Sequence, residues 1–378
     1  MPWYNDLRPV TDPNKEKYAL IFPDFTNEEK MRTIEKLLDL RKSLEPIRLR
    51  KLNDKNLLLA SWNIKEFGHL KARQPEAYFY IAEVVSSFDL IAIQELKTGL
   101  SDLKILMRIL GKHWKFIIND ITEGKDGNSE RSAYIYDTRR VEFSGLAGEI
   151  VIWKDLLEQD EEVQQLKRTP YITGFKTAWK KFALINLHLQ PGDSPEEKAR
   201  RKEEVDLLMK VIDTKVRTKR LWSNNLVLMG DFNLYHEDTD IELLMNEYGF
   251  YESDLLEGEN TNTAMNSAEP FDRIFIRHGN YFPLPSSITG QQGGAIDLFE
   301  TIYKVDDYVH YKDAMLATKG DPSTLTSEIK FRNYFRDHWR KGQLSDHRPI
   351  WLEIDTDGSD QFLRNKLAAF KRVEVSSQ

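Results

Sequence analysis

The chain has 378 residues, no cysteine and a formal net charge of −7 at pH 7. Disulfide scaffolds and thiolate metal sites are therefore excluded, and a bound metal would need oxygen or imidazole ligands. The acidic balance provides no general basic field for nucleic acid, so any anion binding must be local.

No targeting signal stands out in the sequence. The first residues, MPWYNDLRPV, lack a basic region followed by an apolar core. No apolar run approaches the roughly 18 residues that a membrane helix needs. We therefore expect a soluble, cytoplasmic protein without a transmembrane segment, and nothing in the pattern identifies a protein partner.

The N-terminal segment, residues 1–55, is expected to consist of an irregular stretch and one packing helix. A capping box at Thr26–Glu29 begins the helix, and Pro46 follows its end. The predicted apolar stripe consists of Met31, Ile34, Leu37, Leu38 and Leu44. This pattern predicts a helix at the edge of the main body, with a partner-binding helix as the alternative.

From residue 56 onward, strands that are apolar on both faces run into polar residues at their carboxyl ends, where α/β sheets hold ligands. The predicted strands of this kind are Leu57–Asn63, Phe88–Glu95, Lys181–His188 and Leu226–Met229, the last followed by Asp231 and Asn233. Other predicted strands are Trp114–Ile118, Arg131–Asp137 and Tyr171–Phe175. Helices are predicted at Gln74–Ser87, Ser101–Leu110, Ser194–Val216 and Ile241–Tyr248.

Two later strands begin, rather than end, with polar residues. Asp272 opens Phe271–Arg277, and Asp346 and His347 precede Ile350–Ile354. For all these polar residues to meet at one rim, the last two strands must run antiparallel to the others. The sequence therefore predicts mixed sheets in one catalytic domain, residues 56–355, followed by a polar tail, residues 356–378, with a helix near Gln361–Phe370.

The candidate residues form a chemically consistent set. Each also has a structural explanation: His188 as a core histidine, Glu95 as a helix cap, Asn63 as a turn residue. The hard oxygen ligands are Asn63, Glu95, Asp231, Asn233 and Asp346. Such ligands suit Mg²⁺ or Mn²⁺. Two histidines beside a carboxylate-held metal suit hydrolysis of a phosphate ester.

These motifs resemble the endonuclease/exonuclease/phosphatase superfamily, and most closely its deoxyribonuclease I-like nucleases. The matching segments are WN at 62–63, IQE at 93–95, His188, GDFN at 230–233, FDR at 271–273 and SDHRP at 345–349. GDFN and SDH together are specific, whereas either alone is weak. The resemblance covers roughly residues 56–355 and implies a four-layer α/β sandwich of two mixed β-sheets with helices on the outer faces.

By this resemblance, Asn63 and Glu95 are metal ligands with Asp346 nearby, and the expected cofactor is Mg²⁺ or Mn²⁺. Asp231 and Asn233 resemble the residues that orient the attacking water and the phosphate.

The resemblance also gives roles to the two histidines. His188 corresponds to the proton donor to the leaving oxygen, oriented by Glu130, and His347 paired with Asp272 to a base or phosphate clamp. The residues expected to contact the substrate phosphate are Arg168 and Arg131.

Two departures concern the substrate. The deoxyribonuclease I branch is secreted and disulfide-bonded, unlike this chain, and the segment Tyr303–Gly342 is longer than that branch needs. Its aromatic and basic residues are Tyr308, His310, Tyr311, Arg332, Tyr334, Arg336, His338, Trp339 and Arg340. Such a pattern suits stacking on a polynucleotide; the alternative is a packed surface insertion.

The expected function is metal-dependent hydrolysis of phosphodiester bonds, by an endonuclease acting on DNA or RNA. One alternative is a phosphatase or phospholipase-like phosphodiesterase, with Tyr281–Pro285 as an apolar tip at a membrane. The other is an inactive binding module on the same fold.

Overall fold

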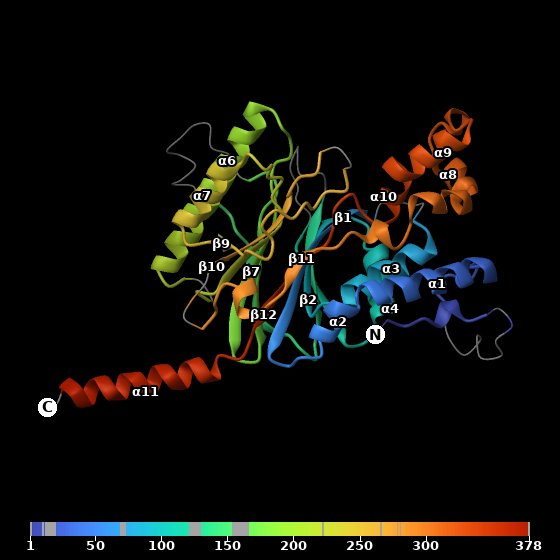
Figure 1. Cartoon of the computed structure of the whole chain (residues 1–378). Helices are drawn as coiled ribbons and strands as arrows, with labels where there is room; N and C mark the ends of the chain where they lie inside the picture. The colour runs from blue at the N-terminus through green and yellow to red at the C-terminus, as the bar shows by residue number, and fades with distance from the viewer. Residues whose placement is uncertain are drawn as a thin grey trace.

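Two six-stranded mixed β-sheets pack face to face, with helices on both outer faces (Figure 1). This computed structural model describes residues 2–9, 11, 20–68, 73–120, 130–152, 166–220, 223–264, 267–277, 279 and 281–376. The four-layer α/β sandwich expected from the sequence is confirmed.

The first sheet is organised around β1, the strand that contains Asn63. β1 pairs parallel to β2 and antiparallel to β12. Across the sheet the strands are β11 (Gly293–Ala295), β12 (Ile350–Asp355), β1 (Asn56–Phe67), β2 (Leu90–Leu96), β4 (Arg131–Asp137) and β3 (Trp114–Ile118). Because β12 is antiparallel, the residues that precede it, including His347, reach the end of the sheet where Asn63 lies.

The second sheet is organised around β8, which ends at Asp231. β8 pairs parallel to β7 and antiparallel to β10. Across the sheet the strands are β5 (Glu142–Glu149), β6 (Tyr171–Thr177), β7 (Lys180–His188), β8 (Leu226–Asp231), β10 (Asp272–Arg277) and β9 (Tyr251–Glu252). Strands β10 and β12 thus run antiparallel to their neighbours, as predicted from the polar residues at the strand ends.

Side chains that alternate along the strands divide the core into three clusters. Leu57 of β1 and Met229 of β8 belong to the cluster between the sheets. Leu58 faces the helices outside the first sheet, and Leu228 faces those outside the second. The first set of helices is α1 (Asn27–Ser43), α2 (Glu45–Arg50), α3 (Pro75–Ser86) and α4 (Ser101–Leu110), and the second is α6 (Pro195–Arg217) and α7 (Thr239–Glu247).

Helix α1 begins at the predicted capping box, in which Glu29 N donates to Thr26 Oγ1 and Thr26 N donates to Glu29 Oε2. The predicted stripe is wrong for three of its members. Met31, Ile34 and Leu38 are exposed by 60%, 40% and 62%. The buried residues of α1 are Lys30, Thr33, Leu37 and Leu40. Two polar residues can be buried on this face because the Thr33 hydroxyl and the Lys30 ammonium both donate to backbone carbonyls.

The segment from Tyr303 to Gln343, here called the helical insertion, is folded against α3. It contains η5 (Val305–Tyr311), α8 (Lys312–Thr318), η6 (Pro322–Thr324), α9 (Glu328–Tyr334), the π-helical turn η7 (Phe335–Trp339) and α10 (Arg340–Gln343). The residues Tyr303, Tyr311, Phe335 and Trp339 are buried and stack on one another. Tyr303 also meets Tyr80 of α3 edge-on. Tyr311 and Trp339 therefore belong to a packed core, which fits the alternative of a packed surface insertion. Tyr308 and Tyr334 are only partly buried, and the contact of the insertion with a polynucleotide stays a prediction.

Several elements differ from the sequence-based expectations. Strands β5, β9 and β11 were not predicted, and β1 and β2 continue past Asn63 and Glu95 to Phe67 and Leu96. Short 3₁₀ turns occur at η1 (Asn5–Leu7), η3 (Ser287–Thr289) and η4 (Leu298–Glu300). The C-terminal helix α11 (Ser359–Ser376) is longer than predicted and extends away from the sandwich (Figure 1). None of the helices in the described residues combines the length and apolarity needed to cross a membrane.

Candidate active site

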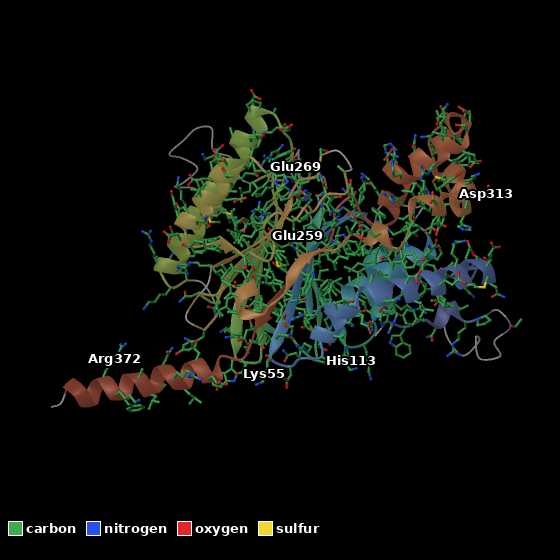
Figure 2. The ribbon with its side chains drawn as sticks, viewed as in Figure 1. Lys55, His113, Glu259, Glu269, Asp313 and Arg372 are labelled. Carbon is green, nitrogen blue, oxygen red and sulfur yellow. The ribbon has the colours of Figure 1, made fainter. Side chains whose placement is uncertain are left out.

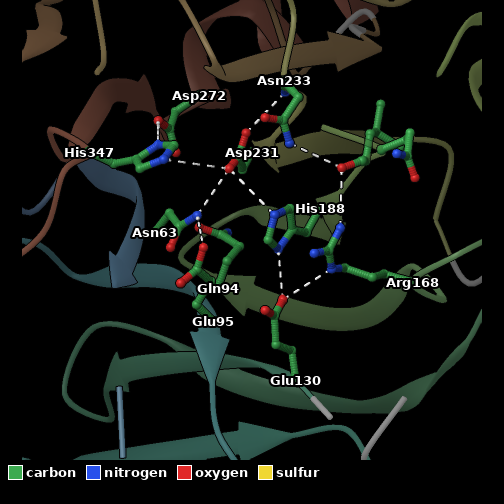
Figure 3. Close-up of polar contacts among 12 residues, drawn as sticks. Asn63, Gln94, Glu95, Glu130, Arg168, His188, Asp231, Asn233, Asp272 and His347 are labelled. Atoms are coloured by element: carbon green, nitrogen blue, oxygen red, sulfur yellow. Dashed lines mark hydrogen bonds and ion pairs between the residues drawn. The ribbon is translucent and has the colours of Figure 1, made fainter. Parts of the chain in front are cut away.

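The strand register brings the predicted residues to one end of the sandwich. His188 on β7 and Asp272 on β10 lie directly across from Asp231 on β8. From the other sheet, Asn63 Nδ2 donates to Asp231 Oδ2 at 3.0 Å. Figure 3 shows these side chains in one polar network with Glu95, Glu130, Arg168, Asn233 and His347.

Asp231 is the point at which two imidazole rings converge. Its Oδ2 atom lies 3.6 Å from His188 Nε2 and 3.8 Å from His347 Nε2. The carboxylate is only 2% exposed, so its interactions with charged groups are weakly screened by solvent. Each ring therefore presents its Nε2 atom to the same buried carboxylate.

Behind His188 stands Glu130, whose Oε2 atom is 3.1 Å from His188 Nδ1. The same oxygen accepts a 3.0 Å bond from Arg168 Nε, and Lys97 Nζ lies 3.1 Å from Oε1. Burial alone would raise the pKa of Glu130, but His188, Arg168 and Lys97 lower that pKa to about 2. Glu130 is thus an ionised carboxylate that orients His188 and leaves Nε2 facing Asp231.

The second ring has its own carboxylate. Asp272 Oδ2 is 2.7 Å from His347 Nδ1. Burial alone would lower the pKa of His347, but the carboxylates of Asp272, Asp231 and Asp346 raise it well above its ordinary value. Burial raises the pKa of Asp272 to about 6, although the contact with His347 lowers this pKa. Near neutral pH the pair is therefore an imidazolium bound to a carboxylate.

Asn63 and Glu95 form the part of the site best suited to a cation. Asn63 Nδ2 donates to Glu95 Oε1 at 3.1 Å, and Glu66 N donates to Glu95 Oε2 at 3.0 Å. Glu95 and Glu66 have φ values of 59° and 44°, a left-handed conformation that is strained for such residues.

The carboxamide oxygen of Asn63 is also available to a cation. Among the described residues, none donates a hydrogen bond to its Oδ1 atom, which is buried. A buried oxygen without a donor beside a carboxylate fits a hard divalent cation such as Mg²⁺. Asn63 and Glu95 therefore fit the metal that the motifs imply.

Asp346, the third predicted ligand, forms an ion pair with Lys65 at 2.7 Å. Burial raises the pKa of Asp346, but His347 and Lys65 outweigh this effect and lower it. Across the part of the chain that is described, no three His, Cys, Asp or Glu side chains gather as a metal site. A cation at Asn63 and Glu95 would therefore depend on the amide and on few carboxylates, and the ligand role of Asp346 stays a prediction.

The GDFN turn depends on the conformations of Gly230 and Asn233. Gly230 has φ +136°, and a Cβ atom there would lie 2.1 Å from Leu187 O. Asn233, at φ 51°, donates from its backbone N to Asp231 Oδ1 and from Nδ2 to Leu189 O, both at 3.0 Å. These bonds fix the orientation of Asp231; the role of Asn233 toward water or phosphate stays a prediction.

The two predicted phosphate-binding arginines are placed differently. Arg168 is buried and bonded to Glu130, so in this structure it supports the His188 side of the network. Arg131 instead donates to Asn119 O and lies 3.7 Å from Asp120, apart from the contacts drawn in Figure 3.

Sequence reasoning missed two lysines of the site, Lys65 and Lys97, which pair with Asp346 and Glu130. A signal was present for Lys65, which lies two positions after Asn63; Lys97 had none, because Glu95 has a φ of 59° and interrupts the extended backbone. In extended backbone, residues two apart leave the same side of the strand.

Comparison with known proteins gives sequence relatives. No protein-family model matches the chain. Rat deoxyribonuclease gamma is 25% identical over 189 residues, which are 47% of this chain and 56% of the relative. Human deoxyribonuclease-1 is 25% identical over 187 residues, covering 47% of this chain and 61% of the relative. The chain thus spans about half the length of the curated relatives it matches.

A solved endonuclease/exonuclease/phosphatase family protein from Bacteroides thetaiotaomicron is 18% identical, with a TM-score of 0.48. The alignment covers 80% of this chain and 98% of that structure. The sequence relatives thus support the resemblance to deoxyribonuclease I-like nucleases that the strand-end motifs indicate.

Proposed function

We propose that the protein is a divalent-metal-dependent hydrolase of phosphodiester bonds that acts on nucleic acid. The observation that carries this proposal is the pair of imidazoles, His188 and His347, each backed by its own carboxylate and each directed at Asp231. Such a pair of rings can divide the work of diester cleavage, one handing a proton to the leaving oxygen and the other holding the phosphate.

The two rings have different partners and hence different roles. His347 is held as an imidazolium by Asp272, which suits it to bind an anionic phosphate oxygen. His188 is oriented by Glu130, with its Nε2 free to hand a proton to the leaving oxygen. Asp231, positioned by Asn233 N, would orient the attacking water.

Asn63 and Glu95 are the residues that would hold the cation, with Asp346 as a further ligand after release from Lys65. When bound, Mg²⁺ or Mn²⁺ would polarise a phosphoryl oxygen and offset the charge that develops there. Arg168 acts through Glu130 in this scheme, because its guanidinium is already bonded to that carboxylate.

A nucleic acid substrate is proposed because the sequence relatives are named deoxyribonucleases. The test is to incubate the purified protein with Mg²⁺ and, in parallel, plasmid DNA, RNA, a small soluble phosphodiester and a phosphomonoester. We expect nicking or cleavage of polynucleotide, and loss of that cleavage in His188→Ala and His347→Ala.

The control is Lys202→Met, a change in an exposed lysine of α6 that pairs with Asp240; it should leave cleavage intact. Hydrolysis of the monoester alone would replace the nuclease with a phosphatase. No hydrolysis of any of the four substrates, by folded protein with Mg²⁺ or Mn²⁺, would refute the proposal in favour of a binding module.

A further inference from the structure

A polar groove lies between the helical insertion and the loop that follows Asn260. Its volume is about 470 Å³, and the residues that line it include Thr263, Ser267, Arg336, Asp337, Arg340 and Lys341. Figure 2 shows Glu269 of the loop and Asp313 of the insertion at the same end of the molecule, away from Lys55 and Arg372. The groove is thus formed by two segments distant in sequence.

Both walls of the groove are tied to the candidate active site. On the loop side, Thr263 N donates to Asp346 O at 2.8 Å, and Asn262 pairs with His347 as an isolated β-bridge. On the insertion side, the buried Arg73 guanidinium donates to Gln343 O at 2.8 Å and to Lys65 O at 2.9 Å. A single guanidinium therefore joins α10 to the segment of β1 that carries Lys65, the partner of Asp346.

Lys341 is the cation in this groove that, among the described residues, forms no direct ion pair, although the carboxylates of Asp346 and Asp337 attract it from farther away. It is partly buried, and no described residue forms an ion pair or hydrogen bond with its ammonium. Burial lowers the pKa of Lys341. The nearby carboxylate of Asp346 raises this pKa, and the ammonium of Lys65 lowers it further. An anion bound beside Lys341 would compensate for the water that the ammonium has lost.

The two arginines of the groove already form contacts within the protein, whereas one hydroxyl in its lining has no hydrogen bond to any described residue. Arg336 forms a two-bond pair with its neighbour Asp337, at 2.7 and 2.6 Å. Arg340 donates to Arg336 O and Tyr303 O and lies over the Phe299 ring, which makes it a structural residue. The Thr263 hydroxyl is buried and, within the described residues, has no hydrogen-bond partner. Within the described residues, Lys341 therefore has no ion pair and the Thr263 hydroxyl no hydrogen bond, so a ligand could supply a partner to both.

The insertion holds Lys341 on a rigid element. Phe335 and Trp339 shortly precede it and pack with Tyr311, and the turn from Phe335 to Trp339 is π-helical, a distortion common at functional sites. Gln343, two residues beyond Lys341, accepts from Gln74 N at 2.7 Å. The backbone on both sides of Lys341 is therefore already ordered, and only the lysine side chain needs ordering when it binds an anion.

We infer that this groove binds a second phosphate of a polynucleotide substrate, displaced along the chain from the phosphate that is cleaved, through Lys341 and Thr263. The inference rests on the proposed function and extends it: the insertion would make the enzyme prefer polymers over substrates with a single phosphate.

The test compares Lys341→Met with wild type on two substrates: a single-stranded oligonucleotide and bis(p-nitrophenyl) phosphate, which has one phosphate. We expect KM for the oligonucleotide to rise about tenfold, the worth of one charged hydrogen bond to phosphate. The slope of log binding constant against log salt should become shallower by about 0.7 for a single strand. For the small diester, kcat/KM should change less than about twofold, since that substrate does not reach the groove.

Four further measurements serve as controls. Lys330→Met, on an exposed lysine of the same insertion that bonds Thr326, should match wild type on both substrates. Lys341→Arg should restore most of the oligonucleotide affinity, and an unchanged melting temperature for Lys341→Met shows that the fold is intact. Oligonucleotide binding measured by fluorescence anisotropy in the His188→Ala background should show the same loss without any turnover.

Equal losses on both substrates, or no loss on the oligonucleotide, would overturn the inference and leave the nuclease proposal standing. A wild-type protein that cleaves the small diester but neither binds nor cleaves oligonucleotide would overturn the proposed substrate itself, and the inference with it.

Discussion

Asp272→Asn offers the sharpest test of the site, because it removes a charge and almost no volume. The Asp272 side chain has no exposed surface, and its Oδ2 atom is 2.7 Å from His347 Nδ1. The neighbouring arginines do not compete for it: Arg273 bonds Glu252 and Glu242, and Arg348 bonds Asp297. The substitution therefore acts mainly on His347, with Thr261 and Asp231 as the other side chains that affect the Asp272 charge.

The expected loss follows from this contact. Without the carboxylate, His347 loses the largest charge that favours its protonated form, and the asparagine amide can instead stabilise the wrong tautomer. Turnover should fall about 10²- to 10⁴-fold, the usual contribution of a positioned acid–base group. Burial disfavours the charge of Asp272, whose pKa is raised to about 6, so a neutral asparagine should cost the fold about 1 kcal/mol or less.

The assay measures turnover, Mg²⁺ dependence and melting temperature on the same preparation. The Mg²⁺ concentration for half-maximal activity should not move, because Asp272 is outside the proposed ligand set. His347→Ala should lose at least as much turnover, and the double variant little more than the worse single variant. A large drop in melting temperature with turnover nearly intact would refute the reasoning and make Asp272 a structural residue.

Three other predictions follow from the geometry. Activity should vanish in excess EDTA, and Glu95→Gln should raise the Mg²⁺ requirement about tenfold or more, since it removes one of few ligand charges; an unchanged metal titration would make Glu95 structural. Glu130 has its pKa lowered from 4.5 to about 2, so its charge contributes stability, about 3 kcal/mol at most, that is fully present above pH 4.5 and is lost as the pH falls toward 2. Thermal unfolding should therefore show Glu130→Gln less stable than wild type at neutral pH, with a gap that closes between about pH 4.5 and 2; a gap independent of pH would contradict the assigned charge. Gly230→Ala should destabilise the protein by about 3 kcal/mol or more in denaturant titration, because the added Cβ atom would lie 2.1 Å from Leu187 O. The control is Gly290→Ala, where φ is +81° but no atom lies within 4 Å of the added Cβ; it should cost only about 1–2 kcal/mol.

The position of the candidate residues at the ends of strands could be read from the sequence because its signal is local. A run such as Leu226–Met229 that is apolar on both faces needs burial in a sheet, and the polar residues after it must reach a rim. The direction of β10 and β12 followed from the same argument, since Asp272 and His347 precede their strands. Asn63, His188, Asp231 and Asp272 could therefore be assigned to one site.

Tertiary structure decided other partners of these side chains. The resemblance implied the His347–Asp272 pair, but the Asn63–Asp231 and Arg168–Glu130 contacts join residues 168 and 38 positions apart, and no local period encodes them. The same holds for α1, where Met31 is as apolar as Leu37 but only Leu37 faces the body. Which face of a helix is buried depends on where the helix docks, and that is set by the surfaces of elements elsewhere in the chain.

The helical insertion shows the same division most clearly. Its sequence contains aromatic and basic residues close together, and such a composition suits either a packed core or a surface that binds nucleic acid. The fold assigns the rings of Tyr311 and Trp339 to a core and leaves Lys341 in a groove beside the active site. Composition determines which side chains a segment contains. Only packing determines which of these side chains are buried in contacts within the protein and which remain available to a ligand.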